Sequence, residues 1–170
     1  MNEILKINAF GPIKQVEIII KSITILIGDQ GTGKSCIAKL YATFKWMEKS
    51  IVSERQSIAY FELPQKFIEL TKYHRIDSFF RDETDIHFDS QYLIFTYKEN
   101  RLTITKKQNI SPVLSKVMYI PAERSILSIA EGNKKLLREL PDSALTFSDR
   151  FDDAKLEYSK GYQLPFGNLS

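Results

Sequence analysis

The apolar residues of this chain follow two different periods, which divide it into predicted strands and helices. β-Branched and other apolar residues dominate residues 4–10 and 14–20, and Gly11 and Pro12 separate the two runs. Runs of this kind on either side of a Gly-Pro break predict a β-hairpin. A third apolar run, ITILI, occupies residues 23–27. The pattern therefore predicts three strands before the first helix.

A helical period begins after residue 33. Apolar side chains recur at every third or fourth position, and the lysines fall largely off that stripe. The apolar positions are Ile37, Leu40, Tyr41, Phe44 and Met47, and the lysines are Lys39, Lys45 and Lys49. We expect this helix to pack on a sheet through its apolar face.

The middle of the chain predicts short helices and a second hairpin. Residues 51–82 carry apolar groups at mixed helical spacing, interrupted by Pro64, which predicts two or three short helices. Residues 92–97 and 102–105 have the composition of paired strands. Residues 86–88 are expected to join this hairpin as a third strand.

The C-terminal part predicts a short strand and further helices. Residues 117–120 form an apolar run that stops at Pro121, and residues 124–140 and 143–159 have helical patterns. No repeat, low-complexity tract or linker interrupts the chain. The whole pattern predicts one α/β domain over residues 1–170, with a mixed sheet.

One segment carries a specific chemical motif. Residues 28–35 match the Walker A pattern G-x-x-x-x-G-K-[ST], between the predicted strand 23–27 and the predicted helix. The candidate ligand-binding residues are Gly28, Asp29, Gln30, Gly31, Thr32, Gly33, Lys34 and Ser35, followed by Cys36. A glycine-rich turn without a ligand is the alternative, but the strand–loop–helix context favours a nucleotide-binding site.

The chemistry of polyphosphate binding explains this spacing. Glycines let successive backbone N–H groups point at an anion, and the start of a helix adds its positive end. Lys34 would supply a cation for the β- and γ-phosphates, and the Ser35 hydroxyl would bind Mg²⁺. Cys36 borders the loop, where a small apolar residue that packs is the expected role.

Composition and charge exclude several other classes. The chain has 170 residues, of which 43% are apolar and 26% charged, and its net charge is +3. That charge is too small to indicate nucleic acid by itself. No apolar run of membrane-spanning length and no secretory leader is visible, so we expect a cytoplasmic protein without a membrane partner. A single cysteine excludes an internal disulfide.

Two further motifs are absent. His74 and His87 lack metal-ligand spacing to each other or to Cys36, which predicts structural or exposed roles for both. Asn133 and Lys134 are not followed by the Asp of a guanine-reading motif. ATP is therefore the expected nucleotide, with only a modest preference over GTP. Its base would lie near Phe10 and the first hairpin, although Phe10 itself is at least as easily explained as a core residue.

Three segments resemble one family when taken together. LKINAFGPI at residues 5–13, ILIGDQGTGKS at 25–35 and YIPAERS at 119–125 are similar to the N-terminal half of bacterial ABC-type AAA ATPases. These are relatives of the SMC, RecF and overcoming-lysogenisation-defect proteins. The resemblance implies a P-loop NTPase fold, in which an antiparallel strand pair precedes the phosphate loop, with ATP and Mg²⁺ as cofactors.

The resemblance also implies a sensor and partners. In this family a loop that senses Mg²⁺ and γ-phosphate follows a strand, so Glu123 becomes the candidate sensor and Mg²⁺ ligand, although the family usually has Gln there. An ordinary helix-start charge is the alternative for Glu123. The resemblance implies a homodimer that sandwiches the nucleotide and leaves DNA possible as a partner of a longer parent protein.

Other elements of the family are not found in the sequence. No apolar strand ends in Asp-Glu, and no Leu-Ser-x-Gly segment occurs. Asp82-Glu83, Glu62 and Asp152-Asp153 are the nearest acidic candidates, and none has the required context. We therefore expect ATP binding, with hydrolysis only when further segments and a second copy complete the site. A small-molecule or nucleoside kinase, or a nucleotide-dependent interaction module, are the alternatives.

Overall fold

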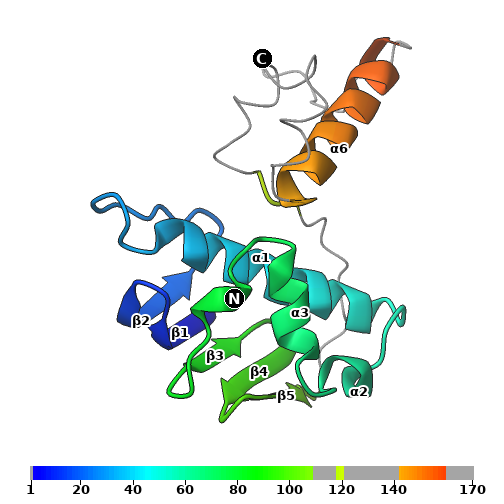
Figure 1. The fold of residues 1–170 in the computed structure, drawn as a ribbon. Coiled ribbons are helices and arrows are strands. Elements are labelled where there is room, and N and C mark those ends of the chain that lie inside the picture. The colour runs from blue at the N-terminus through cyan, green and yellow to red at the C-terminus, as the bar shows by residue number, and fades with distance from the viewer. Residues whose placement is uncertain (1, 109–117, 121–141, 160–170) are drawn as a thin grey trace. The chain divides into compact units, whose positions relative to one another are not determined.

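The computed structural model describes residues 2–108, 118–120 and 142–159 (Figure 1). The chain divides into two compact units, residues 1–118 and 119–170, which we describe separately. The first unit contains β1 (Glu3–Phe10), β2 (Ile13–Ile20), α1 (Lys34–Val52), α2 (Ile58–Phe61), α3 (Lys66–Lys72), the 3-10 helix η1 (Asp77–Phe79), β3 (Asp85–Asp89), β4 (Leu93–Lys98) and β5 (Arg101–Lys106). The second contains α6 (Asp142–Ser159).

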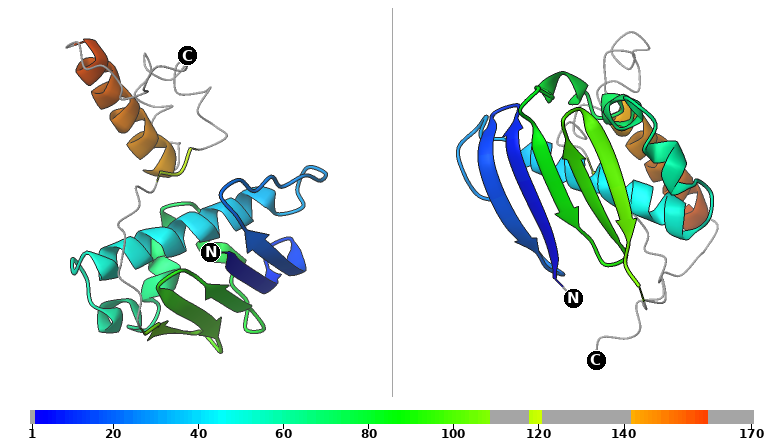
Figure 2. Two further views of the ribbon diagram at one scale, coloured as in Figure 1. Left: turned by 180° about the vertical axis from the view of Figure 1, so that it is seen from behind. Right: turned by 90° about the horizontal axis from the view of Figure 1, so that it is seen from below.

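The strands of the first unit form one antiparallel sheet in the order β2-β1-β3-β4-β5. Strand β1 is central to the N-terminal half, where Ile7 lies opposite Val16 of β2 and Ile86 of β3. Buried and exposed residues alternate along the strands, as expected for an antiparallel sheet with one face on the core. Helices α1 and α3 cover that face, and no described helix of the first unit lies on the opposite face of the sheet (Figure 2, right).

The core lies between α1 and the sheet and is rich in aromatic side chains. The ring of Phe44 on α1 stacks on Phe67 of α3 at 5.1 Å and on Phe88 of β3 at 5.3 Å, measured between ring centroids. Leu40 and Met47, one turn away on the same stripe, are fully buried too. Burial of such side chains contributes about 1.5–3 kcal/mol each, so this face fixes α1 on the sheet.

A buried polar network also fastens α1. The Lys45 ammonium bridges the carboxylates of Glu3 on β1 and Glu48 on α1. The same Glu48 carboxylate accepts hydrogen bonds from the Ser90 hydroxyl and from the backbone N–H of Tyr92, 3.2 Å away. Burial lowers the pKa of Lys45, but its hydrogen bonds with the two carboxylates outweigh that effect, so the pKa is raised overall. Lys45 therefore stays charged inside the domain.

Most of the predicted elements of the first unit are confirmed. Strands β1 and β2 form the first hairpin, β4 and β5 form the second, and β3 joins the second hairpin as expected. The short helices predicted between residues 51 and 82 are α2, α3 and η1. Local pattern was sufficient for these elements because each has its partner nearby in the sequence or a clear apolar stripe.

The third predicted strand is wrong. Residues 23–27 form no strand, and no described strand pairs with them. Ile23, Ile25 and Ile27 are 82%, 76% and 92% exposed. A strand needs a hydrogen-bonded neighbour for its backbone, and β-branched composition alone does not supply one. Since every pairing among the described strands is antiparallel, the mixed sheet is also wrong for the described residues.

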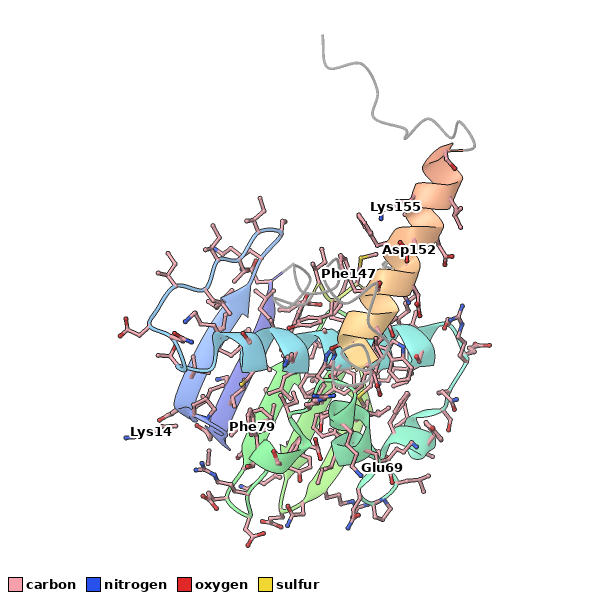
Figure 3. All side chains as sticks on the ribbon, turned by 45° about the horizontal axis from the view of Figure 1, so that its top comes forward. Lys14, Glu69, Phe79, Phe147, Asp152 and Lys155 are labelled. Carbon is pink, nitrogen blue, oxygen red and sulfur yellow. The ribbon has the colours of Figure 1, made fainter. Side chains whose placement is uncertain are left out.

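The second unit is described chiefly by α6, which confirms the helix predicted over residues 143–159. Phe147 and Phe151 stack at 6.0 Å along it, and the Lys155 ammonium lies 4.6 Å from the Phe151 ring centroid (Figure 3). Asp152 and Asp153 are exposed, as expected for a solvated face. Residues 118–120 form no strand, so that prediction is wrong for these three positions, while residue 117 and residues 124–140 lie outside the described part.

Within the described residues, no helix combines the length and the apolar character needed to cross a bilayer.

Candidate phosphate-binding loop

The predicted phosphate loop connects residues 21–27 to α1, and it is the blue loop beside the start of that helix in Figure 1. Helix α1 begins at Lys34, and the N-cap Gly33 has a φ of 97°. The first helical hydrogen bond runs from the N–H of Ile37 to the carbonyl oxygen of Gly33, at 3.0 Å. The N–H groups at the start of a helix have no partner within it, so they are available to an anion.

Gly33 is required at its position for two reasons. Its positive φ is disfavoured for any residue with a Cβ. In addition, a Cβ there would lie only 2.5 Å from Cγ1 of Ile13 and 3.4 Å from Cγ of Pro12. The last glycine of the motif therefore packs closely against the first residue of β2 and the Pro12 ring in the turn before it.

The Lys34 side chain folds back over the loop. Its ammonium donates to the carbonyl oxygens of Gly28 at 2.7 Å and Asp29 at 2.5 Å, and it lies 3.3 Å from the Thr32 hydroxyl oxygen. The Thr32 hydroxyl in turn donates to the Asp29 carbonyl at 2.9 Å. An ammonium has three donors, so these contacts hold it at the centre of the loop.

The other residues of the motif lie at the surface or beside the core. Asp29, Gln30 and Ser35 are exposed, so the Ser35 hydroxyl is accessible to a solvated cation. Cys36 is half-buried and packs against the hydrophobic core. Burial raises the pKa of the Cys36 thiol, and the nearby Lys39 opposes this shift only in part. A packing role, as expected from the sequence, fits Cys36 better than contact with a nucleotide.

The acidic candidates take structural roles where the structure describes them. Glu62 accepts a hydrogen bond from the backbone N–H of Ile104 at 2.7 Å, which covers part of the β5 edge. Asp82 belongs to a turn and accepts from the Asn100 side-chain amide at 3.3 Å. Glu123 and the rest of residues 121–125 lie outside the described residues.

The aromatic residue expected near the base is a core residue. Phe10 is fully buried, and its ring contacts Phe79 and Phe80 edge-on, at centroid distances of 5.8 and 5.0 Å. It has no exposed face on which an adenine could stack. Of the two interpretations of Phe10, the structure supports the core role.

The two histidines lie in different surroundings within the first unit. His74 is buried, and burial, assisted by Lys39, lowers its pKa to about 4, so it is neutral near pH 7. His87 lies on β3, where its Nδ1 is 3.2 Å from the Thr96 hydroxyl oxygen. Among the described residues no cluster of His, Cys, Asp and Glu could hold a metal ion.

Sequence reasoning did not find the contacts that position the loop. Ile13, which lies against Gly33, fell between the two predicted strands, and Lys45 was noted only as a lysine off the apolar stripe. A faint signal existed for Lys45, because Glu48 follows it at helical spacing. No local pattern points from Ile13 to Gly33, because they contact only through the fold.

The chain was compared with known protein families, curated proteins and solved structures. No family model, no curated protein and no solved structure matches it. The functional argument therefore depends on the loop and its surroundings.

Proposed function

We propose that residues 28–35 bind Mg-ATP and that the chain is part of a P-loop ATPase of the ABC type. The observation that carries this proposal is the Lys34 ammonium held at the centre of a Walker A loop, at the start of α1. The ammonium contacts the carbonyl oxygens of Gly28 and Asp29, so it is directed at the loop, which supports a role for Lys34 within the loop.

Binding would exchange one set of partners for another. The carbonyl oxygens of Gly28 and Asp29 now satisfy the ammonium, and the β- and γ-phosphate oxygens of ATP would replace them. The N–H groups at the start of α1 would then donate to the same phosphates. Mg²⁺, when bound, would offset phosphate charge, and the hydroxyl of Ser35, which is exposed, would ligate it.

Hydrolysis requires more than this loop. Phosphoryl transfer needs an oriented water and charge stabilisation on more than one side of the phosphate. We propose that further segments supply these groups, together with a second copy that closes over the nucleotide and with Glu123 as a sensor. The exposed isoleucines at 23, 25 and 27 support the proposal that another polypeptide segment covers this side of the loop.

Radiolabelled ATP binding tests the proposal, with unlabelled ATP and GTP as competitors and Mg²⁺ present. We expect saturable binding, with GTP competing only modestly less well than ATP. A strong preference for GTP would contradict the assignment of ATP, and failure of any nucleotide to bind would contradict the proposed site.

Phosphate release from the same protein tests the second part. We expect release near the background without protein at any concentration of the chain. Release that saturates with ATP and disappears in Lys34→Ala would show a complete catalytic site, and Glu123 and Glu62 would then be the first candidates for its base.

A further inference from the structure

The turn between β1 and β2 is held in an unusual conformation by a distant segment. Gly11 in the turn has a φ of 52°, which a glycine adopts freely. Ala9, near the end of β1, has a φ of 50°, and a positive φ costs a residue with a Cβ about 1–2 kcal/mol. Such conformations persist only where surrounding contacts hold them, and they are often found at functional sites. Here the contacts come from residues 79–84, about seventy residues further along the chain.

Three hydrogen bonds join the end of β1 and the turn to that segment, and hydrogen bonds between Arg81 and Thr84 brace the segment itself. The Arg81 guanidinium donates to the Gly11 carbonyl at 3.0 Å, and the Gly11 N–H donates to the Phe79 carbonyl at 3.1 Å. The Thr84 hydroxyl donates to the Ala9 carbonyl at 2.5 Å and accepts from the Arg81 N–H at 2.8 Å. Figure 3 shows Phe79 beside this end of the sheet, with Lys14 of β2 pointing outward.

The opposite side of the same turn supports the phosphate loop. A Cβ on Gly33 would lie 2.5 Å from Ile13, and a Cβ on Gly11 would lie 2.7 Å from the Phe79 ring. Gly11 therefore lies in close contact with the Phe79 ring, and Ile13, two residues later, lies in close contact with Gly33. A displacement of the turn must move Gly33 or open a gap beside it, because close-packed contacts transmit displacement.

We propose that Arg81 is a positioning residue for the phosphate-binding loop. It holds the Gly11 carbonyl, the turn holds Gly33, and Gly33 sets the direction of the first N–H groups of α1 and of Lys34. The functional consequence rests on the proposed ATP site, but the mechanical link does not.

Arg81 is suited to a clean test because its side chain is exposed. Replacing it with alanine removes the bond to Gly11 and leaves the backbone bond from Arg81 to Thr84 in place. No core cavity results, so the fold should persist. Arg81→Lys keeps a charged donor but loses the planar guanidinium. It should therefore change the loop less than Arg81→Ala does.

The experiment measures hydrogen exchange of the nucleotide-free chain and, separately, its affinity for Mg-ATP. In Arg81→Ala we expect faster exchange of the Ile37 amide, whose acceptor is the Gly33 carbonyl, with unchanged exchange in β4. We also expect ATP to bind about 3- to 10-fold more weakly, the effect of losing one charge-assisted hydrogen bond at an exposed position. Arg55→Ala, which removes an exposed arginine beyond the end of α1, is the matched control and should change neither quantity.

The outcomes separate this inference from the proposed function. Exchange at Ile37 that is the same in Arg81→Ala and wild type would overturn the positioning role, whatever the nucleotide does. An equal rise of exchange in β4 would overturn it as well, because it would indicate general destabilisation. Faster exchange at Ile37 alone, in a protein that does not bind ATP, would support the mechanical link and refute the proposed function. Thr84→Val, which removes the hydroxyl and both of its bonds, should reproduce the exchange effect of Arg81→Ala.

Discussion

The body of the first unit, by which we mean α1, the sheet and the core between them, is tightly packed, whereas residues 21–32, which lead into and form the phosphate loop, are exposed. Between α1 and the sheet, aromatic rings stack in full burial and a charged network is closed by internal hydrogen bonds. Residues 21–32, in contrast, are almost entirely exposed, and three isoleucines among them face solvent. Stability is therefore concentrated in one set of residues and the proposed chemistry in another, so substitutions should separate the two.

The largest effect on the body should come from Phe44→Ala. This ring is fully buried and contacts Phe67, Phe88 and Phe95, so its loss leaves a cavity that neighbouring rings cannot fill. We expect the free energy of unfolding to fall by about 3–5 kcal/mol. Urea denaturation followed by circular dichroism measures it. A loss below about 1 kcal/mol would show that α1 is not packed as described.

Glu48→Ala tests the polar part of the body. It removes the acceptor of Lys45, Ser90 and the Tyr92 N–H, and it should cost about 3 kcal/mol because buried donors lose their partner. The matched control is Glu17→Ala, which breaks the surface pair with Lys6 and should cost less than about 1 kcal/mol. Equal decreases in the free energy of unfolding of the two variants would show that the buried network stabilises the fold no more than an exposed ion pair does.

The acid sensitivity of the body should depend on His74. Its pKa is about 4 when folded, against an ordinary value of 6.5, so between these pH values the unfolded chain binds the additional proton. The free energy of unfolding should therefore fall as pH drops from 6.5 to 4, by up to about 3 kcal/mol from this group. Denaturation of wild type and His74→Gln across that range gives the difference. If the free energy of unfolding of wild type and His74→Gln changed with pH in parallel, the pH dependence could not come from His74.

The smallest effect should come from the exposed segment. Ile25→Thr changes a side chain that is 76% exposed, and we expect the free energy of unfolding to change by less than about 0.5 kcal/mol. The same denaturation experiment measures it, with Phe44→Ala as the reference. A loss above about 2 kcal/mol would show that residues 23–27 are packed in solution, and the contrast between loop and body would fail.

The sequence predicted those elements whose cause is local. The apolar stripe of α1 and the two hairpins follow from side-chain period and turn residues, and all three are present. The strand predicted for the ITILI run is wrong because composition indicates a preference for burial in a sheet, but it does not show that a neighbouring strand is present. These residues have the composition of a strand, but no described strand pairs with them.

The surroundings of the loop could be predicted only in part. The motif predicts Lys34 and its glycines as ligand-binding residues, and this stays a prediction, while the structure shows the ammonium bonded to the Gly28 and Asp29 carbonyl oxygens. The supports come from far away in sequence, since Glu3 pairs with Lys45 over 42 residues and Arg81 reaches Gly11 over 70. No periodicity encodes such pairs, because they form only once the sheet brings the segments together.

Calorimetric titration of wild type, Lys34→Ala and Lys98→Ala with Mg-ATP tests the central claim most directly. Lys98 is an exposed lysine at the end of β4, so its replacement controls for loss of one positive charge. We predict that wild type and Lys98→Ala bind equally, while Lys34→Ala binds about 10- to 100-fold more weakly, the cost of one charge-assisted contact to phosphate. All three should unfold with similar free energies. An unchanged dissociation constant in folded Lys34→Ala would contradict the account.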